Sequence, residues 1–130
     1  MFYFPRTLRE KDINSTNLGK LRTYKLVRSE RTISFRGRLL GFYHASGDSL
    51  EPAAQNQTHL ESIAIFKTNT RYLVWYVLEY LNNEHIEGRR VQVHAAPTLD
   101  GVARFIDAMT YVNKKSFAQA VVEDARAQDS

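Results

Sequence analysis

The chain has 130 residues, no cysteine and a formal net charge of +4, with 43% hydrophobic and 25% charged residues. This length suffices for one domain with its own hydrophobic core, and a sequence without cysteine excludes disulfides, thiolate metal sites and a cysteine nucleophile. No apolar run approaches the ~20 residues of a membrane-spanning helix. The N-terminus lacks the basic region and long apolar segment of a signal peptide, so we expect a cytoplasmic protein that does not bind membranes.

The positive charge is concentrated in the first third of the chain. Residues 1–38 contain ten Lys or Arg against three acids, a net charge of +7, whereas residues 39–130 sum to −3. This uneven distribution predicts that the N-terminal third meets an anionic partner. Such a partner is either a protein with an acidic patch or a nucleic acid.

An arm and two strands are predicted at the start of the chain. Residues 1–19 show no clear period, so we expect an N-terminal arm. Residues 20–28 and 32–44 show a two-residue period, in which alternate positions fall on opposite faces of the segment. This period predicts two strands. Gly37 interrupts the second strand at a place where either a β-bulge or a close backbone approach would fit.

Three further strands are expected in the middle of the chain. Residues 45–57 are mostly turn-forming and polar, which predicts a long loop. Residues 60–67 and 89–95 again have strand patterns. Residues 71–80 fit both a strand and a helical stripe, and their β-branched and aromatic content favours the strand.

The C-terminal part predicts helices. Thr98 is typical of a helix N-cap, and a capping-box pattern at residues 116–119 predicts a second helix to about Ala125. The first helix carries an apolar stripe of Leu99, Val102, Phe105, Ile106 and Met109. We expect residues 127–130 to fray.

Strands that come first and helices that come last indicate an α+β fold. We therefore predict one domain over residues 20–126, in which an antiparallel sheet of about five strands packs against one or two C-terminal helices on one face.

Basic side chains on the first two predicted strands form the candidate binding surface. Two arginines of the first strand share a face with Tyr24, and two arginines of the second strand share a face with each other. If these faces coincide, the sheet presents a basic surface on which Tyr24 is available to stack on a base. The candidate binding residues are Arg22, Lys25, Arg28, Arg36 and Arg38.

A small non-enzymatic binding domain is the function that this sequence favours, in the role of an inhibitor, adaptor or regulatory protein. The chain contains seven tyrosines, one tryptophan and several arginines, which are residue types enriched at protein interfaces. Nucleic-acid binding through the basic sheet face is the alternative hypothesis, although the sequence contains no recognisable nucleic-acid-binding motif.

An enzyme is the third hypothesis. His44 and His59 flank the predicted loop at residues 45–57, and Glu61 shares a strand face with His59. These three side chains are candidates for acid–base catalysis or metal binding. The sequence contains no catalytic or nucleotide-binding motif, so we expect neither a cofactor nor a metal.

Overall fold

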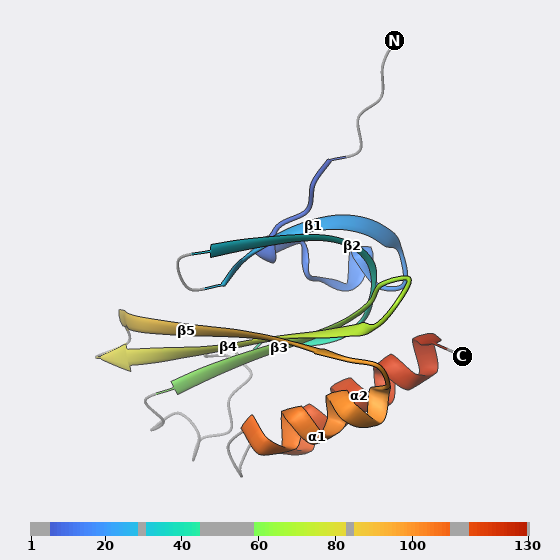
Figure 1. Ribbon diagram of the computed structural model, residues 1–130. Coiled ribbons are helices and arrows are strands. Elements are labelled where there is room, and N and C mark those ends of the chain that lie inside the picture. The colour runs from blue at the N-terminus through green and yellow to red at the C-terminus, as the bar shows by residue number, and fades with distance from the viewer. Residues whose placement is uncertain (1–5, 29–30, 45–58, 83–84, 110–114, 130) are drawn as a thin grey trace.

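A computed structural model describes the protein over residues 6–28, 31–44, 59–82, 85–109 and 115–129 (Figure 1). Five strands form one antiparallel sheet in the order β1-β2-β3-β4-β5, and two α-helices follow them. The strands are β1 (Leu21–Arg28), β2 (Arg31–His44), β3 (His59–Lys67), β4 (Tyr72–Asn82) and β5 (His85–Ala96). The helices are α1 (Leu99–Met109) and α2 (Lys115–Asp129).

This architecture confirms the predicted α+β fold with an antiparallel sheet and C-terminal helices. It also resolves the ambiguous segment at residues 71–80 as a strand, since β4 begins at Tyr72 and continues through residue 80. The predicted loop at residues 45–57 lies outside the described residues. Neither α-helix in the described ranges is long and apolar enough to cross a membrane.

The sheet is strongly curved, so that the β1–β2 hairpin and the two helices lie on opposite sides of β3–β5 (Figure 1). Strand β2 bends between the two layers, and its register with β3 shifts between Leu39 and Gly41. Such a bulge bends the strand that carries it. Leu39 faces the core on the hairpin side and Leu40 the core on the helix side; beyond the bulge the phase is shifted, so that Phe42 packs on the hairpin side and Tyr43 on the helix side.

Two glycines of β2 allow close approaches. A Cβ atom at Gly41 would lie 2.8 Å from the carbonyl oxygen of Val121, so α2 packs directly on the strand backbone there. A Cβ atom at Gly37 would lie 3.0 Å from the carbonyl oxygen of Lys67. Of the two explanations offered for Gly37, the close approach is therefore correct, and the bulge lies three residues further on.

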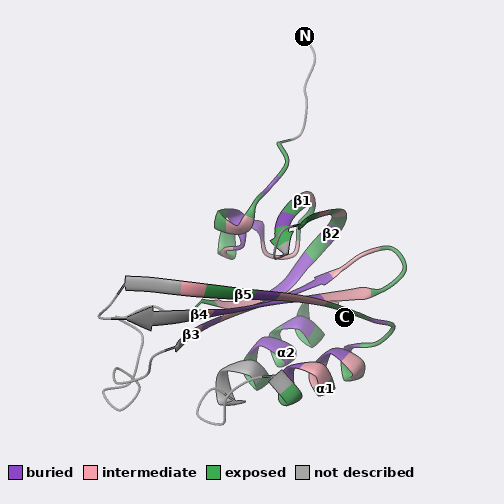
Figure 2. Cartoon of the chain, turned by 60° about the vertical axis from the view of Figure 1, so that its left-hand side comes forward, coloured by how far each residue is buried: buried purple, intermediate pink, exposed green. Residues whose placement is uncertain are grey.

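Two hydrophobic cores lie on the two sides of the sheet (Figure 2). The core beneath the helices joins the sheet to the apolar stripe of α1 and to α2; its helical members are Leu99, Val102, Ile106, Val121, Val122 and Ala125. The core between the sheet and the hairpin contains larger aromatic side chains, namely Tyr24, Phe66 and Trp75, with Leu8 and Ile13 from the N-terminal segment.

The ends of the two helices are anchored by polar contacts. The Thr98 hydroxyl accepts a hydrogen bond from the Gly101 backbone N–H at 3.1 Å, which confirms the predicted N-cap. At the end of α2, the Asp129 carboxylate accepts hydrogen bonds from Lys67 Nζ and Tyr72 Oη, both at 2.6 Å. The Lys67 hydrogen bond also holds the pKa of Asp129 below its ordinary value. The prediction of a frayed tail is therefore wrong for residues 127–129, which these contacts hold in the helix.

The N-terminal segment packs against the hairpin instead of extending freely. Leu8 pairs with the outer edge of β1 through two backbone hydrogen bonds of 2.8 Å, one to the Thr23 carbonyl and one from the Lys25 N–H. Two short 3-10 helices, η1 (Glu10–Asp12) and η2 (Ser15–Asn17), follow Leu8. The burial of apolar residues on either side of η1 explains why this segment is docked although it has no strand or helix period.

Candidate functional site

The register of the hairpin decides which side chains share its outer face. Lys25 lies opposite Ser34, Thr23 opposite Arg36, and Leu21 opposite Arg38. Directly opposed residues of an antiparallel pair point to the same face. We call this outer surface the hairpin face; it consists of Leu21, Thr23, Lys25, Val27, Thr32, Ser34, Arg36 and Arg38.

The hairpin face combines positive charge with exposed aliphatic groups. Lys25, Arg36 and Arg38 are all exposed, and neither Lys25 nor Arg36 takes part in an ion pair within the described part of the chain. Among the described residues, the exposed large hydrophobic side chains are Leu21 and Val27, each 46% exposed. Both therefore lie on the same surface as the three cations.

Tyr24 occupies the opposite, inner face of the hairpin. It lies opposite Phe35, is completely buried, and its ring centroid lies 5.7 Å from that of Phe35 and 4.8 Å from that of Phe66. The prediction that Tyr24 stacks on a base at the surface is therefore wrong. The predicted strand alternation in β1 is correct, but the curvature of the sheet turns the face that carries Tyr24 toward the core.

Burial raises the pKa of Tyr24 to about 12, against an ordinary value of 10.0. Between these values the unfolded chain releases the phenolic proton whereas the native protein keeps it, so rising pH stabilises the unfolded state. We expect the free energy of unfolding of the wild type to fall more steeply from pH 10 to 12 than that of Tyr24→Phe, as measured by urea denaturation. Equal pH slopes would contradict the burial of this hydroxyl.

A basic pocket adjoins the hairpin face at the outer edge of β1. It has a volume of about 380 Å³, and its lining combines three arginines with smaller polar and apolar side chains. These residues are Arg6, Leu8, Asn17, Leu21, Arg22, Thr23 and Arg36. Arg22 lies opposite Gly37, on the other face of β1 from Lys25 and Arg38, and lines the pocket together with Thr23 and Arg36 of the hairpin face.

The wall of the basic pocket is held by Asp12, which is buried. Its carboxylate accepts hydrogen bonds from Arg6 Nη2 at 2.8 Å and from the Arg9 backbone N–H at 2.9 Å. The Asn17 amide in turn donates to the Asp12 carbonyl oxygen at 2.8 Å. One of the three arginines is thus paired with a carboxylate. Arg22 donates only to the carbonyl oxygen of its neighbour Leu21, at 3.0 Å, within the described residues.

Two of the candidate acid–base residues, His44 and Glu61, lie on opposite sides of the sheet. His44 lies opposite Ser62, and its Nε2 donates to the Ile13 carbonyl oxygen at 2.8 Å on the hairpin side of the sheet. Glu61 is buried beneath the helices, where its carboxylate accepts a hydrogen bond from Tyr76 Oη at 2.6 Å. His44 and Glu61 therefore cannot act together, because successive strand positions point to opposite faces. The pairing of Glu61 with His59 stays a prediction, since the His59 side chain lies outside the described residues.

Two of the predicted site residues, Arg28 and His59, have side chains that lie outside the described part of the structure. Among the residues that are described, no group of three His, Asp or Glu side chains is placed to hold a metal ion.

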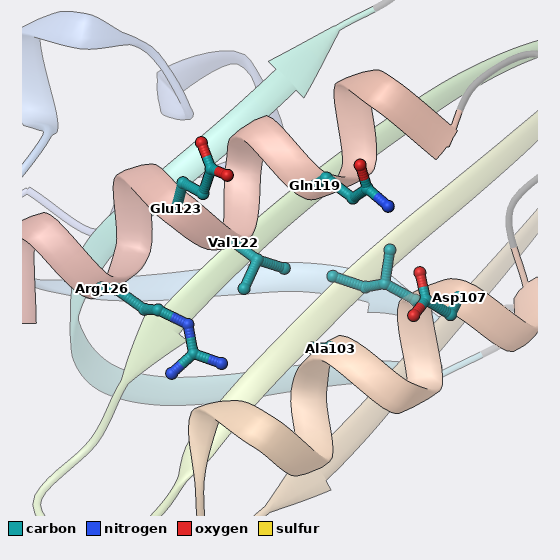
Figure 3. A pocket seen from close by; sticks show the side chains of 7 residues that line it. Ala103, Asp107, Gln119, Val122, Glu123 and Arg126 are labelled. Carbon is teal, nitrogen blue, oxygen red and sulfur yellow. The ribbon is translucent and has the colours of Figure 1, made fainter.

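A second cavity, of about 230 Å³, lies between the two helices (Figure 3). Its floor includes Ile106 and Val122, which are buried in the core, so its accessible surface comes mainly from the rim. The rim carries Asp107 and Glu123 together with Arg126, whose guanidinium is paired with Asp100 at 2.5 Å. This crevice offers little free apolar surface and no excess of positive charge, so it is a weaker candidate than the hairpin.

Sequence reasoning missed two features of the hairpin. The first is the exposure of Leu21 and Val27, which the alternation with Lys25 indicates once Tyr24 is assigned to the interior. The second is the contribution of Arg6 and Asn17 to the basic pocket, for which the sequence carries no periodic signal. Comparison with known proteins adds no relative: no family model, no curated protein and no solved structure matches this chain.

Proposed function

We propose that this protein is a non-enzymatic protein-interaction module whose hairpin face binds an acidic partner, in the manner of an inhibitor, adaptor or regulatory protein. The observation that carries the proposal is the position of Leu21 and Val27, the exposed large hydrophobic residues of the described chain, beside Lys25, Arg36 and Arg38. Protein interfaces combine apolar contact points with a polar rim, and the hairpin face supplies groups of both kinds along β1 and β2.

The composition of the hairpin face favours a protein over a nucleic acid. Single-stranded nucleic acids are held by aromatic side chains on which bases stack, together with cations that contact phosphates. The aromatic residue expected for this role, Tyr24, is buried, and the exposed apolar residues of the face are aliphatic. Leucine and valine cannot stack on bases, but they do fill apolar contact points on a protein partner.

The fold supports the hairpin face as a preformed surface. Strand β2 belongs both to the hairpin and to the main sheet, and the inner side of the hairpin is filled by the aromatic core. A surface that is rigid before binding loses less conformational entropy when the partner arrives. The helices cover the other part of the sheet and leave the hairpin face exposed (Figure 1).

A matched pair of double variants tests the proposal. Peptides that bind the wild-type protein would first be selected from a displayed library of random sequences. Their affinities for the wild type would then be compared with those for two double variants, Arg36→Gln/Arg38→Gln and Arg71→Gln/Arg104→Gln. Both variants lose the same charge, but Arg71 and Arg104 are exposed residues that do not belong to the hairpin face. We expect the selected peptides to be acidic with apolar residues, and to bind the first variant roughly tenfold or more weakly while binding the second normally.

Oligonucleotides provide the contrasting probe in the same experiment. If the partner were a nucleic acid, binding would weaken steeply with salt, with a log–log slope of about −2 to −3 for three cations that neutralise phosphates. The Arg36→Gln/Arg38→Gln variant would flatten this slope by about two contacts. Such behaviour without any peptide binding would overturn the proposal in favour of nucleic-acid binding. Peptide affinities that are equal for both variants would also overturn it.

A further inference from the structure

We propose that the basic pocket binds a phosphate monoester, and that the natural occupant is a phosphorylated side chain of the acidic protein partner. This inference rests on the proposed function, because Arg36 belongs to both the pocket and the hairpin face. A partner that lies across the face would therefore reach the pocket at the edge of β1.

The charge of the pocket matches that of a phosphate monoester. Arg6, Arg22 and Arg36 line the pocket, and Asp12 neutralises one of them through its ion pair with Arg6, which leaves a charge of about +2. A phosphorylated side chain carries about −1.5 to −2 near neutral pH. A carboxylate or a phosphodiester carries only −1 and would leave part of this positive charge unpaired.

The type and placement of the cations also suit phosphate. Guanidinium groups are planar forks that bind phosphate oxygens through pairs of hydrogen bonds. The three arginines come from three segments, which are the N-terminal segment, β1 and β2. Donors that approach from separate segments suit a tetrahedral anion, whose oxygens point in different directions.

Hydrogen bonds hold the N-terminal segment that forms one wall of the pocket in a fixed position. Leu8 is joined to β1 through both its N–H and its carbonyl oxygen, and the segment that follows is held by the buried Asp12 and Asn17. The side chains that line a binding site must be held in place by such surrounding contacts if they are to bind a small anion. A volume of about 380 Å³ leaves room beyond the phosphate for the residue that carries it.

Titration with a phosphoserine pentapeptide, Ala-Ala-pSer-Leu-Ala, tests the inference, with the arginine side-chain NMR signals as the readout. We expect the Arg22 and Arg36 signals to shift on binding, and Arg22→Gln to weaken binding about tenfold or more. Arg22→Lys, which keeps the charge but loses the fork, should recover only part of the affinity. Arg104→Gln, an exposed change on α1 outside both the pocket and the hairpin face, should bind normally. The thermal midpoint of each variant shows whether it is folded.

Three further probes decide the chemistry. The unphosphorylated and glutamate-substituted peptides should bind at least tenfold more weakly than the phosphopeptide. Glycerol phosphate should bind in the same pocket but more weakly; equal affinity would support the phosphate site and assign a free ester as its ligand. Glutamate that binds as well as phosphoserine, or phosphopeptide binding that is unaffected by Arg22→Gln, would overturn the inference.

The failures of the two proposals can be told apart. A protein that binds acidic library peptides through Arg38 but does not bind the phosphopeptide contradicts the phosphate site alone. A protein that binds phosphopeptide through Arg22 while Arg36→Gln/Arg38→Gln leaves library-peptide binding unchanged contradicts the hairpin face as the wider interaction surface.

Discussion

Trp75→Ala is expected to lower the free energy of unfolding by about 3–5 kcal/mol. The Trp75 side chain is 1% exposed and lies in the core between the sheet and the hairpin. Its removal leaves a large cavity that the surrounding structure cannot fully close. Strand β4, which carries Trp75, and its neighbour β3 are each held between two other strands of the sheet. Urea denaturation followed by circular dichroism measures the change.

The control for this variant is Arg90→Ala, which removes an exposed side chain from the adjacent strand β5. Its expected effect is within about 0.5 kcal/mol of the wild type. A loss of less than about 1 kcal/mol in Trp75→Ala would show that the hairpin does not close over a packed core. In that case the hairpin face would not be the rigid surface that we propose.

Ile106→Ala is expected to lower the free energy of unfolding by about 2–5 kcal/mol. Ile106 is 1% exposed in the second core, where α1 and α2 pack on the sheet. Arg104→Ala, an exposed change on the same helix, is the control, and urea denaturation is again the measurement. A loss of less than about 1 kcal/mol in Ile106→Ala would mean that α1 is not docked through this stripe.

The fold was largely predictable because the strands and the first helix carry strong periodic patterns. The alternation in residues 60–67 and the stripe that contains Ile106 correspond to buried faces in the structure. The curvature was harder to predict, since it depends on a bulge at Leu40, after which Phe42 instead of Tyr43 faces the hairpin core. A local pattern carries no information on which of these cores a residue will join.

The sequence predicted which basic residues belong to the candidate site, but not which of them share a face of the hairpin. Lys25, Arg36 and Arg38 do form a basic surface, whereas Arg22 lies on the other side of the strand together with the buried Tyr24. The reason is that β1 has apolar residues on both faces, so its sequence alone does not decide which face turns inward. The cross-strand register and the curvature of β2 decide it.

The most direct test of the hairpin face as the interaction surface is an amide NMR footprint. The isotopically labelled protein would be titrated with an acidic peptide selected on the wild type. We predict that the backbone signals of Lys25, Ser34 and Arg36 shift, and that those of Asp107 and Glu123 on the helices do not. Shifts confined to the helices, with the hairpin signals unchanged, would contradict the proposed function.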